Sequence, residues 1–239
     1  MKTIDWEYLA QHMHPREPES DKNTYGRVLA VCGCRDYIGA PFFAAQAAVR
    51  TGSGIVTLAL PSCIYPILAA KLNEPTFVPL ETGADGKISV DCLPSLDRRA
   101  AILAGPGLGI SEGVTQAVKT IIEQAECPLV LDADGINALA GHIDVVEKAK
   151  YPVILTPHSH EFARICDVPS ESTAVCCCSR DIGRLLQTRT VRCIKTCTAI
   201  RAWQRAGAEM SCPASFCLCW DRGWIRSRRL PAAHIFTVG

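Results

Sequence analysis

The sequence has no apolar run that approaches the ~18 residues needed to cross a bilayer. Its first residues, Met1 to Glu7, lead into polar sequence and do not form the apolar stretch of a secretory leader. A formal net charge of only +1 gives no overall attraction to nucleic acid or to a membrane surface. We therefore expect a soluble, cytoplasmic protein that binds neither.

The composition also excludes disorder and collagen-like structure. Hydrophobic residues make up 48% of the 239 positions and charged residues 21%, with 17 Gly and 15 Pro that form no internal repeat. This composition is typical of a globular protein with a sizeable core.

The small net charge hides two unlike pieces. Residues 1–165 hold 14 basic and 19 acidic side chains with five Cys, whereas residues 166–239 hold 11 basic and five acidic side chains with nine Cys. Without a leader, we expect the 14 Cys to be reduced thiols rather than a disulfide framework. The second piece lacks the repeated C-x2-C pairs of a zinc site, so zinc is not favoured and any metal ligand stays unassigned.

From residue 26 to residue 165, β-branched apolar runs alternate with helical patterns. This rhythm predicts an α/β fold with a mostly parallel sheet covered on both faces. The expected strands are 27–32, 55–60, 100–104, 128–131 and 152–155, and the expected helices are 40–50, 64–72 and 112–125. After Ile165 the pattern predicts no further strand–loop–helix unit.

Glycine-rich or polar segments follow four of these strands, at 33–39, 105–109, 132–137 and 156–161. Because ligands of open α/β sheets bind outside the carboxyl ends of the strands, we expect these segments to converge on one site. Gly105–Gly109 suits a close approach of the backbone to phosphate, although a plain tight turn has the same composition. It does not match the G-x-G-x-x-G fingerprint, which disfavours a Rossmann dehydrogenase.

Two polar segments carry candidate chemistry. In residues 132–137, Asp132, Asp134 and Asn137 can hold a cation, orient a water or bind a ribose, while the alternative role of Asp134 is to cap a helix. Residues 156–161 gather a hydroxyl, two imidazoles and a carboxylate, or else simply begin a helix.

In their order, these segments resemble the ADP- or ATP-dependent NAD(P)H-hydrate dehydratase family. The segments that carry the resemblance are Tyr25-Gly26-Arg27-Val28, Cys32-Gly33-Cys34 with Tyr37-Ile38-Gly39-Ala40-Pro41, Arg50-Thr51-Gly52-Ser53-Gly54-Ile55-Val56-Thr57, Gly105-Pro106-Gly107-Leu108-Gly109, Asp132-Ala133-Asp134 with Asn137, and Leu155-Thr156-Pro157-His158 with Glu161-Phe162. They cover some two-thirds of the chain.

The resemblance implies a three-layer α/β/α ribokinase-like domain, incomplete at its C-terminus, in residues 1–165. It implies an enzyme that uses ADP or ATP, with Mg²⁺, to dehydrate hydrated NADH or NADPH, and homo-oligomers when the domain is complete. It implies substrate contacts by Ala40, Gly107, Gly109 and His158. It further implies a supporting polar site of Asp132, Asn137 and Glu161.

The family's second half should supply an L-K-G-x-x-T loop and an N-P-G-M-A-T-G-G-S-G-D segment, whose Asp is the expected catalytic base. Neither segment is present in the sequence. Ile194–Thr198 resembles the L-K-G-x-x-T loop only in part, since it is one residue short and lacks the Gly. We therefore assign no catalytic residue. We interpret residues 166–239 as an out-of-frame translation of the rest of the same domain. Joining the third nucleotide of each codon to the first two of the next across 201–214 allows G-M-A-T-G-G-S-G-D-V-L-S-G in full.

Two other functions stay open. A small-molecule kinase of the same superfamily, of the hydroxyethylthiazole type, would share the fold, although the Y-x-G-A-P and T-P-H segments favour the dehydratase. An α/β scaffold with a nucleic-acid- or zinc-binding tail would use the Arg and Trp of residues 166–239, but no basic–aromatic periodicity supports it.

Overall fold

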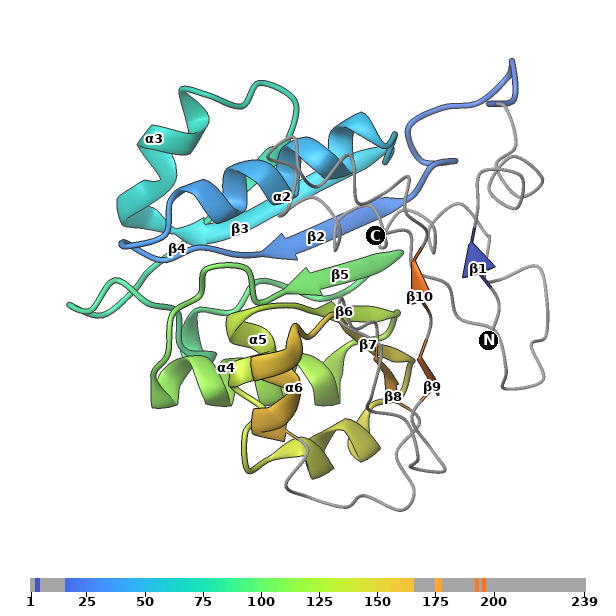
Figure 1. Ribbon diagram of the computed structural model, residues 1–239. Helices are drawn as coiled ribbons and strands as arrows, with labels where there is room; N and C mark the ends of the chain where they lie inside the picture. The colour runs from blue at the N-terminus through green and yellow to red at the C-terminus, as the bar shows by residue number, and fades with distance from the viewer. Residues whose placement is uncertain (1–2, 5–15, 166–174, 178–191, 194, 197–239) are drawn as a thin grey trace.

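Parallel strands form the centre of the structure (Figure 1). The computed structural model describes residues 3–4, 16–165, 175–177, 192–193 and 195–196. The strands of the main sheet are β2 (Arg27–Val31), β3 (Ile55–Pro61), β4 (Thr76–Leu80), β5 (Ala101–Ala104), β6 (Leu129–Leu131), β7 (Val153–Leu155), β8 (Val175–Cys177) and β9 (Arg192–Cys193), in the order β4-β3-β2-β5-β6-β7-β8-β9. All their pairings are parallel, and β1 (Thr3–Ile4) pairs separately with β10 (Lys195–Thr196).

Helices cover both faces of this sheet. The α-helices are α2 (Gly39–Arg50), α3 (Tyr65–Ala69), α4 (Glu112–Gln124), α5 (Asp134–Asn137) and α6 (Ser159–Ile165), and the 3-10 segments are η1 (Ser62–Ile64), η2 (Val90–Cys92) and η3 (Ile143–Lys148). The α2 and α3 helices lie on one face, and α4, α5, α6 and η3 lie on the other (Figure 1). The predicted three-layer α/β architecture is therefore confirmed.

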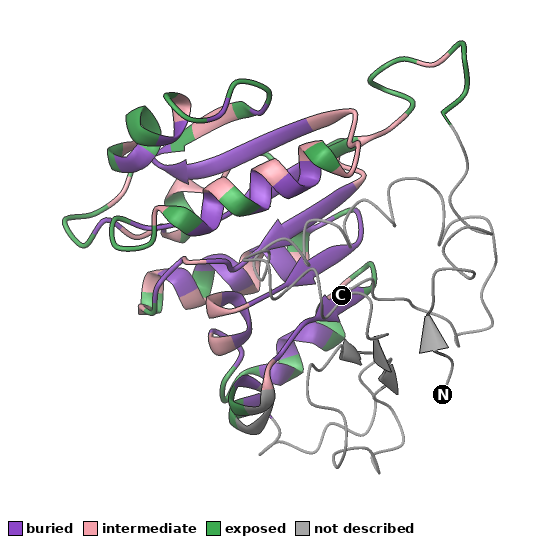
Figure 2. Cartoon of the chain, turned by 45° about the horizontal axis from the view of Figure 1, so that its top comes forward, coloured by how far each residue is buried: buried purple, intermediate pink, exposed green. Residues whose placement is uncertain are grey.

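The alternation of side chains along each strand builds two cores. On β2, Val28 and Ala30 pack toward the alanine-rich α2 helix, while Leu29 and Val31 pack toward α4. Because successive side chains of a strand point to opposite faces, a strand covered on both faces is buried along its length. Figure 2 shows the central strands buried and the outer helix surfaces exposed.

Three elements add detail to the expected pattern. The β4 strand was not predicted, and its Pro79 is tolerated because β4 is an edge strand. The short helix expected within 64–72 is present as α3, with the 3-10 turn η1 before it. The short strands β8 to β10 follow Ile165, where the pattern predicted no strand–loop–helix unit. The remaining residues of the second piece, 166–239, lie outside the described part of the chain.

No helix in the described part is both long enough and apolar enough to span a membrane.

Candidate functional site

The last residues of four adjacent strands lie in one row. Val31 of β2 is in register with Ala104 of β5, Ala104 with Leu131 of β6, and Leu131 with Leu155 of β7. The next residue along each strand therefore begins a loop at the same edge of the sheet. This register confirms that the four loop segments lie at one edge of the sheet, while their forming one ligand site stays a prediction.

The chain runs outward in opposite directions from the boundary between β2 and β5. After β2 it goes to β3 on one side, and β5 continues the sheet on the other side. Such a topological switch point leaves a crevice at the carboxyl ends of the two strands, where ligands of α/β sheets bind. Here Gly33 donates its N–H to the carbonyl of Pro106 at 2.8 Å, so the two loops that border the crevice are joined.

The glycine loop, Gly105–Gly109, fits tightly between its neighbours. Gly105 has a φ of +128°, and a Cβ added to it would lie 1.9 Å from the carbonyl oxygen of Asp132. Gly107 has a φ of +67°, and a Cβ there would lie 2.8 Å from the Cβ of Ala40. Both positions thus need glycine for conformation and for space. Ala40 and Gly107, two residues expected to contact the substrate, are brought together.

Asp132, which follows β6, is only 7% exposed, and we call this buried end of the candidate site its floor. Its Oδ1 accepts a 2.6 Å hydrogen bond from Oγ1 of Thr156, the residue that follows β7. The charge of Asp132, together with burial as the larger cause, raises the pKa of the Cys32 thiol. The sequence indicated a hydroxyl in residues 156–161 as candidate chemistry, and the structure gives the Thr156 hydroxyl its acceptor, Asp132.

The alternative role of Asp134 was to cap the N-terminus of α5. The structure shows that Asp134 does not form this cap. It is the first residue of α5, the N-cap residue is Ala133 with a φ of +50°, and no side chain caps this helix. Instead, Oδ2 of Asp134 accepts the N–H of Gly109 at 2.8 Å, and Oδ1 accepts from the side-chain amide of Asn137 at 3.3 Å. The carboxylate therefore holds the glycine loop to α5.

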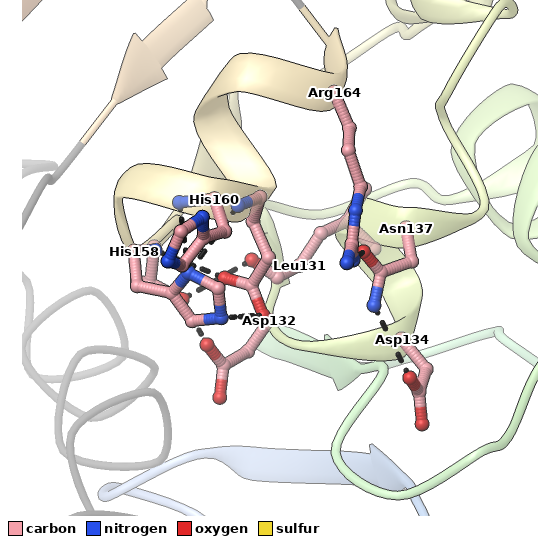
Figure 3. A network of polar contacts seen from close by, with 9 residues as sticks. Leu131, Asp132, Asp134, Asn137, His158, His160 and Arg164 are labelled. Atoms are coloured by element: carbon pink, nitrogen blue, oxygen red, sulfur yellow. Dashed lines mark hydrogen bonds and ion pairs between the residues drawn. The ribbon is translucent and has the colours of Figure 1, made fainter.

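Asn137 also receives a hydrogen bond from α6. Its Oδ1 accepts from Nη1 of Arg164 at 2.6 Å (Figure 3). Arg164 is exposed and was not a predicted site residue, because a lone Arg in the last turn of a helix carries no motif of its own. The contacts run from α6 through α5 to the glycine loop.

His158 and Glu161 form a closed pair at the start of α6. The backbone N–H of His158 donates to Oε2 of Glu161 at 2.9 Å, and Nε2 of His158 lies 3.2 Å from Oε1 of the same carboxylate. Nδ1 of His158 accepts the backbone N–H groups of His160 and Glu161, at 3.1 and 3.2 Å. The imidazole is therefore fixed by both nitrogens (Figure 3). Its side chain is 44% exposed, whereas that of Glu161 is 8% exposed, so the ring can meet a ligand while the carboxylate stays below.

Among residues 16–165 and the short strands that the structure describes, no three His, Cys, Asp or Glu side chains gather as a metal site. Asp132 and Asp134 already accept hydrogen bonds from neutral donors.

The fold and the position of the candidate site at the carboxyl ends of the strands indicate the class of protein. A ribokinase-like superfamily protein from Enterococcus faecalis superimposes with a TM-score of 0.59 at 25% identity, covering 70% of this chain and 57% of that one. The protein is therefore a ribokinase-like α/β protein with its candidate site at the carboxyl ends of the strands.

The family follows from the sequence match. The profile of the NAD(P)H-hydrate dehydratase family matches residues 28–199, and the chain belongs to this family. The bifunctional NAD(P)H-hydrate repair enzyme of Salinibacter ruber is 43% identical over 156 residues, which are 63% of this chain and 29% of that protein. The ADP/ATP-dependent NAD(P)H-hydrate dehydratase of Bacillus subtilis, co-crystallized with ATP/Mg²⁺, has a TM-score of 0.57 at 36% identity and covers 68% of this chain and 55% of that one. The matched part thus spans well under two thirds of either relative.

Proposed function

We propose that this chain carries the substrate-binding part of an ADP- or ATP-dependent NAD(P)H-hydrate dehydratase. The observation that carries the proposal is the single row of strand ends, which places the Ala40–Gly107 contact and the His158–Glu161 pair on one edge of the sheet. The Bacillus subtilis relative is named an ADP/ATP-dependent NAD(P)H-hydrate dehydratase, and the Salinibacter ruber relative a bifunctional NAD(P)H-hydrate repair enzyme.

In the proposed reaction, the terminal phosphoryl group of ATP or ADP is transferred to the ring hydroxyl of hydrated NADH or NADPH. The carbon–oxygen bond then breaks, inorganic phosphate leaves with that oxygen, and loss of a proton from the adjacent carbon restores the ring double bond. The products are the dihydronicotinamide dinucleotide, phosphate and the shortened nucleotide.

The described residues serve binding and orientation in this reaction. Gly107 and Ala40 let the backbone approach the dinucleotide closely, and Gly109 stays in place because its N–H is held by Asp134. His158 presents a fixed imidazole edge to the ligand. Mg²⁺ carried by the nucleotide would neutralise phosphate charge beside Asp132, Asn137 and Glu161.

The nucleotide cradle and catalytic base belong to the part of the domain that we propose is encoded out of frame in residues 166–239. The family match runs to residue 199, so it includes residues 166–199 and does not by itself mark where the frame changes. The support for the proposal is the shifted reading, which allows the missing glycine segment across residues 201–214. The nucleotide sequence of the gene around residues 165–205 tests it, because an uninterrupted frame that encodes the printed tail would overturn it.

The activity test compares two proteins, the printed chain and a frame-corrected chain. Each is incubated with hydrated NADH and either ADP or ATP while absorbance at 340 nm is followed. The corrected chain is expected to regenerate NADH, and the printed chain is expected to show little or no turnover. A kinase of the hydroxyethylthiazole type would instead consume the nucleotide without any return of absorbance.

We further propose that the complete domain acts in the cytoplasm as a homo-oligomer. The five cysteines of residues 16–165 are free thiols, which supports a reducing compartment. Light scattering during size-exclusion chromatography of the frame-corrected protein measures its mass, and a monomer at micromolar concentration would contradict the oligomer.

A further inference from the structure

Arg35, in the loop after β2, and Lys87, in the loop after β4, have no carboxylate partner among the residues that the structure describes. Nη1 of Arg35 donates to the carbonyl of Ala84 at 2.9 Å, and Nζ of Lys87 donates to the carbonyl of Ile110 at 3.1 Å. In the described part of the chain, neither charge has a carboxylate oxygen within 4.0 Å. The contacts with neutral oxygens leave four guanidinium N–H groups and two ammonium N–H groups for other acceptors.

Both side chains are held along their stems. The Lys87 stem lies against Gly109, where an added Cβ would be 2.9 Å from Cε of the lysine. The Arg35 stem lies against Gly86 in the same way, with a distance of 2.7 Å from an added Cβ to Cβ of the arginine, and Arg35 N–H donates to the Gly86 carbonyl at 3.2 Å. The Lys87 side chain is therefore held beside the glycine loop, and the Arg35 side chain beside the adjoining turn at residues 84–86. Holding a side chain in place lowers the entropy lost when a ligand binds.

The charges of the site are separated by depth. Asp132 and Glu161 are buried, and each accepts a hydrogen bond from a neutral donor, Thr156 or the backbone of His158. Arg35 is exposed and Lys87 is half-buried, and we call these two residues the rim of the candidate site. Asp85, the acidic neighbour of Lys87, uses Oδ1 to accept the backbone N–H of that lysine at 3.2 Å. A ligand that is anionic at the rim and carries a neutral hydroxyl at the floor matches this arrangement.

We propose that Arg35 and Lys87 bind the diphosphate of the dinucleotide substrate. This inference rests on the proposed function, and it adds two residues that come from outside the glycine, aspartate and histidine segments. Charge-assisted hydrogen bonds from fixed cations are the strong class of contact to phosphoryl oxygens. The floor of the site then receives the hydrated ring at a set distance from the rim.

The test measures dissociation constants of the full chain by calorimetry. Arg35→Met and Lys87→Met keep the apolar stems and remove the charges, while Arg35→Lys and Lys87→Arg keep the charges. Lys71→Met, at an exposed position just after α3, is the matched control. The ligands are hydrated NADH, the hydrated reduced mononucleotide, which lacks the diphosphate, and inorganic pyrophosphate.

Each charge-removing variant is expected to raise the dissociation constant of hydrated NADH about three- to tenfold. The charge-keeping variants are expected to raise it much less. The mononucleotide should be affected less than the dinucleotide, and pyrophosphate should compete with hydrated NADH in the parent chain but not in the double Met variant. Equal effects of the rim variants and Lys71→Met, or equal losses for both nucleotides, would overturn the proposal.

Failure of the proposed function looks different. In that case the parent chain would not prefer hydrated NADH over NADH, whereas pyrophosphate binding that depends on Arg35 and Lys87 would remain. If hydrated NADH binds selectively and the rim variants leave it unchanged, the dehydratase assignment stands and the rim assignment is wrong.

Discussion

The backbone N–H of Gly109 donates a 2.8 Å hydrogen bond to Oδ2 of Asp134, a residue 25 positions further along the chain. This bond joins the loop after β5 to the helix after β6. Because the loop is expected to contact the dinucleotide, its position depends on a carboxylate that need not touch the ligand. Asp134 is in this sense a positioning residue.

Substitution of Asp134 tests this role. Asp134→Ala leaves the Gly109 N–H without its acceptor and should lower the free energy of unfolding by about 1–2 kcal/mol. The affinity for hydrated NADH should fall as well, because the loop is no longer held. Asp134→Asn keeps an oxygen acceptor and should lose less of both. Urea unfolding and calorimetry measure the two quantities, and an Ala variant that binds like the parent would refute the positioning role.

The contact between Arg164 and Asn137 is expected to act through Asp134. Arg164→Ala should weaken the binding of hydrated NADH severalfold. In an Asn137→Ala background the same substitution should have little further effect, because the two residues share one chain of contacts. Arg50→Ala, in the last turn of α2, controls for the loss of one positive charge. Calorimetry on the four proteins of the cycle gives the coupling, and strictly additive losses would mean that Arg164 acts independently of Asn137.

The central part of the fold was predictable from the sequence, since buried parallel strands are continuous apolar runs, as in residues 28–31 of β2. The meeting of the loops was predictable too, because parallel strands place all their carboxyl ends at one edge. The features that the local sequence pattern did not predict depend on how distant segments pair in the sheet. Pro79 argues against a strand unless one knows that β4 is an edge.

The role of Asp134 illustrates the same limit within the site. An Asp at the start of a helix predicts a side-chain cap. Here the carboxylate of Asp134 instead accepts the backbone N–H of Gly109, and no side chain caps α5. Arg164 was missed for a similar reason, because its role depends on an acceptor, Asn137, that lies 27 positions away in the sequence.

The buried thiols predict a loss of stability at alkaline pH. Burial, as the main cause, raises the pKa of Cys127 from 9.0 to about 12. In the unfolded chain this thiol loses its proton near pH 9, while the folded protein keeps it. The free energy of unfolding should therefore fall as pH rises from about 9 to about 12, by at most about 1.4 kcal/mol per pH unit for this group.

The measurement is urea unfolding at pH 8 and at pH 10.5, on the parent chain and on Cys127→Ala. The variant should be less stable at pH 8, because it loses buried volume, but its stability should fall less between the two values. Lys and Tyr groups titrate in both proteins, so the difference between the slopes isolates the thiol. An equal loss of unfolding free energy with pH in both proteins would contradict the raised pKa of Cys127.

Gly107 offers the sharpest separation of backbone strain from steric contact. Gly107 and Gly141 have nearly the same backbone angle, with φ of +67° and +72°, but an added Cβ at Gly141 meets nothing within 4 Å, whereas at Gly107 it meets Ala40 and Tyr37 at 2.8 and 2.9 Å. Gly141→Ala should therefore cost about 1–2 kcal/mol of unfolding free energy through conformation alone. Gly107→Ala should cost more, and it alone should abolish measurable binding of hydrated NADH, because Ala40 and the glycine loop can no longer approach each other. Equal losses of stability and unchanged binding in both variants would mean that the contact of Ala40 with Gly107 does not form part of the ligand site.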